Sequence, residues 1–212
     1  MINWGFIGAG YVATQALAPA VHAASNANLY AVASRDPKRS AKLSAQRIHN
    51  SYQDLIDDPL VDVVYINLPN HLHAQWSIAA LKAGKNVLCE KPLALNYLQA
   101  QEMAQVAKEC KRLLVEAVWS RWHPRFIRAV ELVKGGAIGE LITIDSEFSF
   151  TADLSNNYRQ EPSAGGGALL DVGPYQLHLW SAMATLGDLE ITDVKQSISA
   201  TGVDLTTQVS AK

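Results

Sequence analysis

A lysine suited to proton transfer lies in the stretch "CEKPLALN", residues 89–96, between an acid, Glu90, and Pro92. An amine in a half-buried cleft, with another positive charge beside it, can exchange a proton with a substrate hydroxyl group. The other interpretation of Lys91 is a surface lysine that precedes a turn proline. The residue types alone support both, so the case for chemistry depends on what else meets Lys91 in the fold.

An acid, a phenol and an imidazole occur together in the later stretch "GGGALLDVGPYQLHLW". Asp171, Tyr175 and His178 are spaced by four and three residues. We expect a helix to begin near Gly173, with Pro174 in its first turn, because proline fits that position. Tyr175 and His178 then share one face and Asp171 lies at its N-terminal end, where the three could orient a hydroxylated substrate and pass a proton. The alternative is an ordinary helix cap followed by an amphipathic core face.

Glycines near the start of the chain predict a site for a dinucleotide. In "GFIGAGYVA", Gly8, Gly10 and Ala13 form the pattern G-x-G-x-x-A between a strand-like run and a helix-like run. The two glycines permit a tight turn and close approach of a pyrophosphate, and Ala13 permits tight packing of the helix. The helix begins with Tyr11 and Val12, whose N–H groups we expect to face the phosphates. An incidental glycine turn is the alternative.

The second strand-like run lacks the acid that usually binds the ribose of NAD. The stretch "AVASRD" places Ser34 and Arg35 at that point and Asp36 one residue beyond. A serine hydroxyl and a guanidinium group can bind the 2′-phosphate that distinguishes NADP from NAD. We therefore predict that NADP(H) is preferred over NAD(H). A solvated loop arginine is the alternative.

Polar residues also follow the next two strand-like runs, in "NLPNHLH" and "CEKPLALN". The carboxyl ends of parallel strands line one crevice, so we expect these residues to converge near Gly8, around the nicotinamide ring of the cofactor. The candidates are Asn67, Asn70, His71, Glu90 and Lys91. His71 and His73 have no companion cluster of Cys, His or carboxylate residues elsewhere in the sequence, so we expect no metal site.

These motifs are positioned by a regular alternation of short apolar runs and helix-like segments in the first half of the chain. Strands are expected at 2–8, 28–34, 61–69, 86–90 and 112–119, and helices at 11–24, 37–48, 73–84 and 96–111. Such alternation predicts an α/β fold with a doubly wound parallel sheet in a first domain, residues 1–118.

The pattern changes after about Trp119, where we place the start of a second domain, residues 119–212. A helix is expected at 123–136 and another after a loop rich in Gly, Ser and Asn. Strand-like segments are found at 139–150, 189–199 and 203–211.

The composition is that of an ordinary globular protein. The chain has 212 residues, 49% of them hydrophobic, enough for one large or two small domains. Its formal net charge is −2, with 18 Lys and Arg against 20 Asp and Glu, so we expect neither nucleic acid nor a membrane as a partner. Cys89 and Cys110 lack metal-ligand spacing and are expected to be reduced core thiols. We find no export or anchoring signal and expect a cytoplasmic protein.

Taken in order, "GFIGAGYVA", "AVASRD", "NLPNHLH", "CEKPLALN", "EAVWSRWHP" and "GGGALLDVGPY" resemble the glucose-fructose oxidoreductase/inositol dehydrogenase/MocA (Gfo/Idh/MocA) family over nearly the whole chain. EKP at a strand end combined with GGGALLDVGxY downstream is more specific than the glycine motif alone. "EAVWSRWHP" and the spacing of Asp171 and Tyr175 are most similar to the branch of dihydrodiol dehydrogenases and NADP-dependent D-xylose dehydrogenases. The resemblance implies a Rossmann domain followed by a partial α+β domain with an open, mainly antiparallel sheet.

The resemblance also implies roles for individual residues. Lys91 matches the family's cleft lysine near the nicotinamide and the reacting oxygen, Tyr175 matches the phenol that acts as acid and base, and Asp171 matches a site aspartate. Trp119 and Arg121 resemble residues near the cofactor and the substrate pocket. The implied reaction transfers a hydride between NADP(H) and a CH–OH group of a sugar or cyclic diol. Other branches have histidine in place of Tyr175, so an aldose or a dihydrodiol is favoured over an inositol.

Members of this family are longer than 212 residues, which implies that part of the second domain's sheet is missing from this sequence. Either a fragment or a naturally shortened protein would fit. The face of that sheet commonly forms a dimer interface, so a homodimer is expected besides a small-molecule substrate. The alternative function is a dinucleotide-binding regulator, or an inactive shortened relative, which binds the cofactor without turnover.

Overall fold

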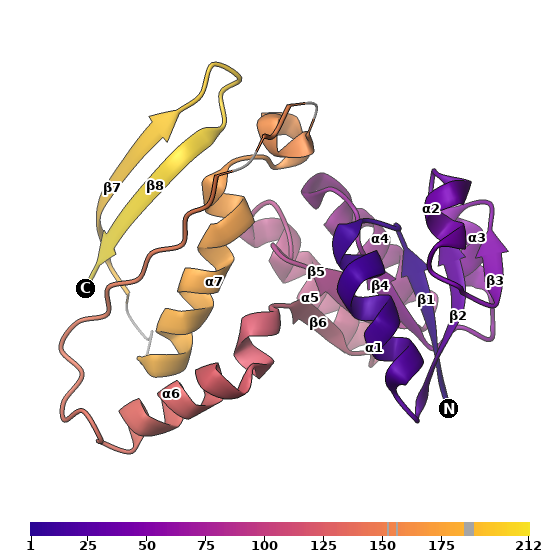
Figure 1. Ribbon diagram of the computed structural model, residues 1–212, viewed down its shortest axis with the longest axis horizontal. Helices are drawn as coiled ribbons and strands as arrows, with labels where there is room; N and C mark the ends of the chain where they lie inside the picture. The colour runs from indigo at the N-terminus through magenta and orange to yellow at the C-terminus, as the bar shows by residue number, and fades with distance from the viewer. Residues whose placement is uncertain (152, 156, 185–188) are drawn as a thin grey trace. The chain divides into compact units, whose positions relative to one another are not determined.

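The computed structural model describes residues 1–151, 153–155, 157–184 and 189–212. The chain divides into two compact units, Met1–Ala117 and Val118–Lys212, whose elements are labelled in Figure 1. In the described ranges, no helix combines the length and the apolar character needed to cross a membrane.

The first unit is built around a parallel sheet of six strands in the order β3-β2-β1-β4-β5-β6. The strands are β1 (Ile2–Ile7), β2 (Ala27–Ala33), β3 (Arg47–His49), β4 (Val63–Ile66), β5 (Asn86–Glu90) and β6 (Leu114–Ala117). Chain order reverses at β1, which pairs with β2 on one side and β4 on the other. In doubly wound sheets the loops that follow the strands on either side of such a reversal line the ligand crevice. The predicted doubly wound α/β fold is confirmed.

Helices cover both faces of this sheet, because its strands are apolar on both sides. They are η1 (Ala13–Leu17), α1 (Ala18–Ala23), α2 (Pro37–Ala41), α3 (Tyr52–Asp57), η2 (Asn70–Leu72), α4 (His73–Lys82) and α5 (Tyr97–Cys110). Phe6 and Tyr65 belong to one buried cluster, which includes residues of α1. Their neighbours Ile7 and Ile66 belong to another, which includes residues of α4 and α5.

The segment 37–48, expected as one helix, contains a short helix and an edge strand. The helix α2 ends at Ala41, and Ser44 then takes a left-handed conformation with φ 53°. The chain continues into β3, which pairs in parallel with β2. A three-residue strand is too short to produce an alternating pattern in the sequence, and α3, which follows it, was not expected either.

The second unit contains two longer helices and a hairpin. Its elements are η3 (Trp119–Trp122), α6 (Pro124–Lys134), η4 (Tyr158–Gln160), η5 (Pro162–Ala164), α7 (Ala168–Met183), β7 (Ile191–Ile198) and β8 (Asp204–Ala211). The strands β7 and β8, yellow in Figure 1, pair antiparallel, which agrees with the expected second domain. The expected strand at 139–150 does not form within the described residues. Ile142 is 88% exposed there, and an apolar strand without a ladder partner has little to stabilise it.

The helix α7 begins earlier than expected, at Ala168 rather than near Gly173, so Pro174 lies inside it. The reason is a cap supplied by the hairpin. Asp204 Oδ2 accepts the N–H of Leu169 at 2.7 Å, which satisfies one of the unpaired donors of the first turn. Gly167 has φ +106°, and a Cβ there would collide with the Asp204 carboxylate.

A buried carboxylate holds β3 to the end of α3. The Asp58 side chain is 2% exposed, and its Oδ2 lies 3.0 Å from His49 Nε2 and 3.1 Å from Arg47 NH1. Its Oδ1 accepts the N–H of Leu60 at 3.0 Å. Burial raises the pKa of Asp58, but the hydrogen bond from Leu60 and the contacts with His49 and Arg47 outweigh it. The pKa of Asp58 therefore lies below its ordinary value.

We predict that Asp58→Asn lowers the free energy of unfolding at pH 7 by about 1–3 kcal/mol, the usual range for lost charge-assisted hydrogen bonds. Because the folded pKa is depressed, the carboxylate stabilises the fold above its ordinary value of 3.8. That contribution is lost as the pH falls through the folded pKa, so the difference between variant and parent should shrink at acid pH. Urea denaturation at a series of pH values measures it.

Asp57→Asn is the matched control, because it removes an exposed carboxylate from the preceding position. Its effect should stay within about 0.5 kcal/mol. Equal losses in the two variants would contradict the role given to Asp58.

Candidate functional site

The glycine turn after β1 has the close approach that a pyrophosphate site needs. Gly8 has φ +94°, and a Cβ there would collide with the carbonyl oxygen of Asn67. A Cβ at Gly10 would lie 2.5 Å from Asn67 Oδ1. Larger side chains at either position would displace the loop after β4. Ala13 is fully buried, as tight packing of the following helix requires.

The helix that follows the turn offers backbone donors. It begins at Tyr11 and continues through η1 and α1. N–H groups in the first turn of a helix have no carbonyl partner within it, and they attract negative charge. The side chains of Tyr11 and Val12 are 82% and 43% exposed. The turn and the helix start together fit the pyrophosphate of a dinucleotide.

A chain of hydrogen bonds joins the glycine turn to the EKP loop. The N–H of Gly10 donates to Asn67 Oδ1 at 2.9 Å, and Asn67 Nδ2 donates to the Tyr65 hydroxyl at 3.4 Å. The Tyr65 hydroxyl donates to Glu90 Oε1 at 2.6 Å. The other carboxylate oxygen of Glu90 accepts the N–H of Lys91 at 3.3 Å. Glu90 is thus the final acceptor, which receives bonds from the Tyr65 hydroxyl and the Lys91 N–H. The Gly10 N–H fixes the direction of the chain, because it determines which end of the Asn67 amide faces the turn.

Burial keeps the phenol in this chain of hydrogen bonds protonated. Desolvation of Tyr65, together with the charge of Glu90, raises the pKa of the phenol, which stays protonated as a donor. Burial also raises the pKa of Glu90, although the Tyr65 hydroxyl and the Lys91 charge oppose the shift. Lys91 itself is half-buried, and its peptide bond to Pro92 is cis.

The end of β2 presents basic groups, while the nearby acid is engaged elsewhere. Asp36 caps α2, since its Oδ1 accepts the N–H of Lys38 at 2.9 Å. Its Oδ2 lies 3.4 Å from Arg39 Nε. Ser34 Oγ accepts the N–H of Asp36 at 3.0 Å. The structure therefore leaves Arg35, rather than an acid, exposed at the point where the ribose acid of NAD-binding proteins usually lies.

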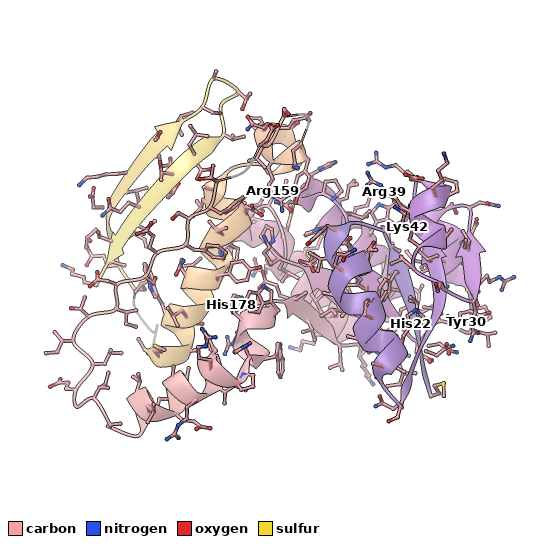
Figure 2. All side chains as sticks on the ribbon, in the orientation of Figure 1. His22, Tyr30, Arg39, Lys42, Arg159 and His178 are labelled. Atoms are coloured by element: carbon pink, nitrogen blue, oxygen red, sulfur yellow. The ribbon has the colours of Figure 1, made fainter. Side chains whose placement is uncertain are left out.

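Arg35 interacts with a tyrosine, Tyr52, that the sequence did not indicate. Burial raises the pKa of the Tyr52 phenol, and the charge and hydrogen bond of Arg35 oppose that rise. Tyr52 packs edge-on against Trp76, with ring centroids 5.0 Å apart. Further cations follow in the same stretch, since Figure 2 shows Arg39 and Lys42 on and just after α2.

The polar residues of "NLPNHLH", which follow β4, differ in their exposure to solvent. Asn70 is 4% exposed, His71 lies at the surface and His73 is fully buried. Among the described residues, no three His, Cys, Asp or Glu side chains converge as a metal ion would require.

The second unit brings a tryptophan to the predicted phenol. Trp119 Nε1 donates to the Tyr175 hydroxyl oxygen at 3.0 Å. The rings of Trp119 and Phe148 lie 5.9 Å and 5.3 Å from the ring of Tyr175, measured between centroids. This packing restricts the phenol to one orientation on α7. The role of Phe148 was not expected, because the segment that contains it was predicted as a plain strand.

The other two predicted polar residues of α7, Asp171 and His178, have arginine partners in this unit. Arg159 Nε donates to Asp171 Oδ2 at 2.8 Å, and Arg121 NH1 donates to His178 Nδ1 at 3.2 Å. Burial lowers the pKa of Arg159, but the hydrogen bond and charge of Asp171, with nearby phenols, raise it further. Asp171 is thus a buried ion-pair partner, and Figure 2 labels Arg159 and His178 on η4 and α7.

Two groups of predicted residues are therefore assembled, one in each unit. Gly8, Gly10, Asn67, Glu90 and Lys91 are joined by contacts at the carboxyl edge of the parallel sheet. Trp119 with Tyr175, and Arg121 with His178, are joined around α7. Sequence reasoning missed Tyr65, Tyr52 and Arg159. Tyr65 lies within the apolar run "VVYIN", where nothing distinguishes it from a core residue.

Comparison with known families assigns both parts of the chain. Residues 2–117 match the model of the "Oxidoreductase family, NAD-binding Rossmann fold", and residues 126–211 match the "GFO/IDH/MocA C-terminal domain".

Curated relatives share about a third of the residues. D-xylose 1-dehydrogenase (NADP(+)) 2 of Haloferax volcanii is 38% identical over 180 residues, which cover 81% of this chain and 54% of that protein. Trans-1,2-dihydrobenzene-1,2-diol dehydrogenase of Mus musculus is 34% identical over 214 residues, which cover 98% and 64%. The chain thus spans about half to two thirds of the length of these relatives.

A solved structure with the same fold is that of KijD10, a 3-ketoreductase from Actinomadura kijaniata, in complex with NADP and TDP-benzene. It superposes with a TM-score of 0.92 at 31% identity, and the match covers 99% of this chain and 66% of that one. The glycine turn, the strand order and the two matched segments all indicate the same family. The chain belongs to the Gfo/Idh/MocA family of oxidoreductases.

Proposed function

We propose that the protein is an NADP(H)-dependent oxidoreductase that acts on a CH–OH group of a sugar or a cyclic diol. The observation that carries the proposal is the hydrogen-bond chain from Gly10 to Lys91. It joins a turn that fits a pyrophosphate to the backbone N–H of Lys91, whose side-chain amine can exchange a proton, at one edge of the sheet. The NADP(H) nicotinamide, when bound, supplies the hydride acceptor or donor. The names of the D-xylose and diol dehydrogenase relatives support the substrate class.

The protein's own residues bind the cofactor and move the proton. Lys91 of the first unit is the proposed proton-exchanging amine, and Tyr175 of the second unit is the proposed acid/base phenol. Loss of a proton from the substrate oxygen and of a hydride from its carbon leaves a carbonyl group. Tyr175 accepts the N–H of Trp119, and a phenol hydroxyl can donate a hydrogen bond as well as accept one. Asp171, paired with Arg159, places the first turn of α7. The further predicted cofactor contacts are Tyr11, Val12, Ala13, Ser34, Arg35, Asn67, Asn70, His71, Glu90, Trp119 and Arg121.

The preferred cofactor is NADP(H), because Arg35 stands at the end of β2 while Asp36 caps α2. A homodimer through the second unit's sheet stays a prediction from the family resemblance.

We predict that Arg35→Ala raises the Kd for NADPH by about 10-fold or more and leaves the Kd for NADH nearly unchanged, because only NADPH carries the 2′-phosphate. Tryptophan quenching in titrations with the two cofactors measures both values. The control is Lys82→Ala, which removes an exposed cation from the last turn of α4. A parent protein that binds NADH as tightly as NADPH would contradict the assignment.

We predict that Tyr175→Phe reduces turnover by about 10²-fold or more with little change in NADPH affinity, because the ring contacts remain and the acid/base group is lost. The exposed Tyr97 provides the matched control, and Tyr97→Phe should keep full turnover. Unchanged turnover in the Tyr175 variant would remove this phenol from the mechanism.

A substrate screen tests the proposed reaction directly. The protein is incubated with NADP and a panel of aldoses, cyclic diols and inositols, and the absorbance of NADPH is followed. Turnover of an aldose or a diol supports the proposal. Tight NADPH binding without turnover of any panel member would favour the dinucleotide-binding regulator instead.

A further inference from the structure

His73 connects the two loops that frame the expected nicotinamide position. It is the first residue of α4 and is fully buried. Its Nδ1 lies 2.7 Å from the carbonyl oxygen of Pro92, in the EKP loop after β5. Its Nε2 lies 2.9 Å from the carbonyl oxygen of Leu68, in the loop after β4. One side chain thus bridges the backbones that carry Lys91 on one side and Asn67 on the other.

The side chain does not serve the start of its own helix. The residue at the helix cap, Leu72, makes no side-chain capping bond, and the His73 ring reaches past the helix to the two loops. Both of its contacts are carbonyl oxygens, which accept hydrogen bonds and donate none. Each neutral tautomer of the ring therefore donates to one loop at a time.

Burial favours the neutral ring. Desolvation lowers the pKa of His73, and it outweighs the two carbonyl contacts that favour the charged form. Two charged groups face the ring from neighbouring elements: Lys91, which lowers the pKa further, and Glu116 on β6, which raises it. Glu116 also accepts the N–H of Leu93 at 2.8 Å, so β6 supports the same loop from behind.

We propose that His73 is a positioning residue, which sets the spacing of the loops after β4 and β5 and thereby places Lys91 against the nicotinamide end of the cofactor. The inference deepens the proposed function and rests on it for the catalytic measurement. Its physical basis is that displacement of a proton-exchanging group by about 1 Å can lower the reaction rate on the order of 10²-fold. The adenine end of the cofactor is expected by the loops after β1 and β2, which His73 does not contact through either of its two hydrogen bonds.

Three variants separate the two contacts. His73→Asn keeps a donor at the Nδ1 position, toward Pro92, and His73→Gln keeps one at the Nε2 position, toward Leu68. His73→Leu removes both donors. His22→Gln is the matched control, since His22 Nε2 also contacts one carbonyl oxygen, that of Leu43 at 2.9 Å, at a place remote from the strand ends.

Binding is measured first, because it does not require turnover. Titrations use NADPH and 2′,5′-ADP, which has the phosphorylated adenosine but lacks the nicotinamide. We expect His73→Leu to weaken NADPH binding by about 10-fold and to leave 2′,5′-ADP binding within about twofold, in line with loss of contacts at one end only. Equal weakening of both ligands, or of neither, in a variant that remains folded would overturn the proposal.

Turnover then distinguishes the two loops. We expect His73→Asn to retain more activity than His73→Gln, because only the asparagine keeps the donor to the EKP loop, and we expect His73→Leu to lose about 10²-fold. Urea unfolding of every variant accompanies the assays. Turnover that follows stability, rather than the identity of the retained donor, would reduce His73 to a structural residue.

The outcomes also separate this proposal from the proposed function. If the parent binds NADPH but turns over no substrate, the proposed function fails, while the different response of the two ligands still decides the role of His73. If the parent binds neither ligand, both are overturned.

Discussion

The partly buried carboxylate of Glu90 is the constraint around which the functional edge of the first unit is arranged. A carboxylate removed from water costs free energy unless donors surround it. The Tyr65 hydroxyl is one of these donors, and it comes from a strand that is buried on both faces. Its oxygen is in turn satisfied by Asn67, whose other end is held by the N–H of Gly10. The glycine turn, β4 and the EKP loop therefore keep one geometry, and none can shift alone without leaving a polar group unpaired.

The parallel sheet could be predicted from the sequence because each of its long strands carries its own signal. Runs such as "VDVVYINLP" are apolar without alternation, as strands covered on both faces must be, and Gly84 closes α4 with φ +80°. The edge strand β3 carries no such signal. It is three residues long and owes its place to the Asp58 contacts, which come from a residue outside the strand. Long-range ion pairs of this kind have no periodicity to detect.

Only part of the candidate site could be predicted from the sequence, for a similar reason. Glycines that must approach another backbone are indicated by their type and spacing, whereas Lys91 is equally consistent with a surface lysine until the family resemblance gives it a role. The partners that orient these residues are not indicated, because Tyr65, Tyr52 and Arg159 each act on residues distant in sequence. The apolar run around Tyr65 indicates a core residue, and Tyr65 is indeed 1% exposed. Its hydroxyl can reach Glu90 only because β4 and β5 are neighbours in the sheet.

The cap of α7 has a consequence for the order in which the second unit acquires structure. The carboxylate of Asp204 holds the first turn of the helix that carries Tyr175, yet it lies 35 residues beyond Leu169. A ribosome makes the chain from its N-terminus, so the whole of α7 emerges before the residue that caps it. During that interval the first turn, which begins at Ala168, lacks this acceptor and therefore one of the contacts that hold it in helical form. The ordered start of α7 is therefore a late event of synthesis, completed only when β8 arrives.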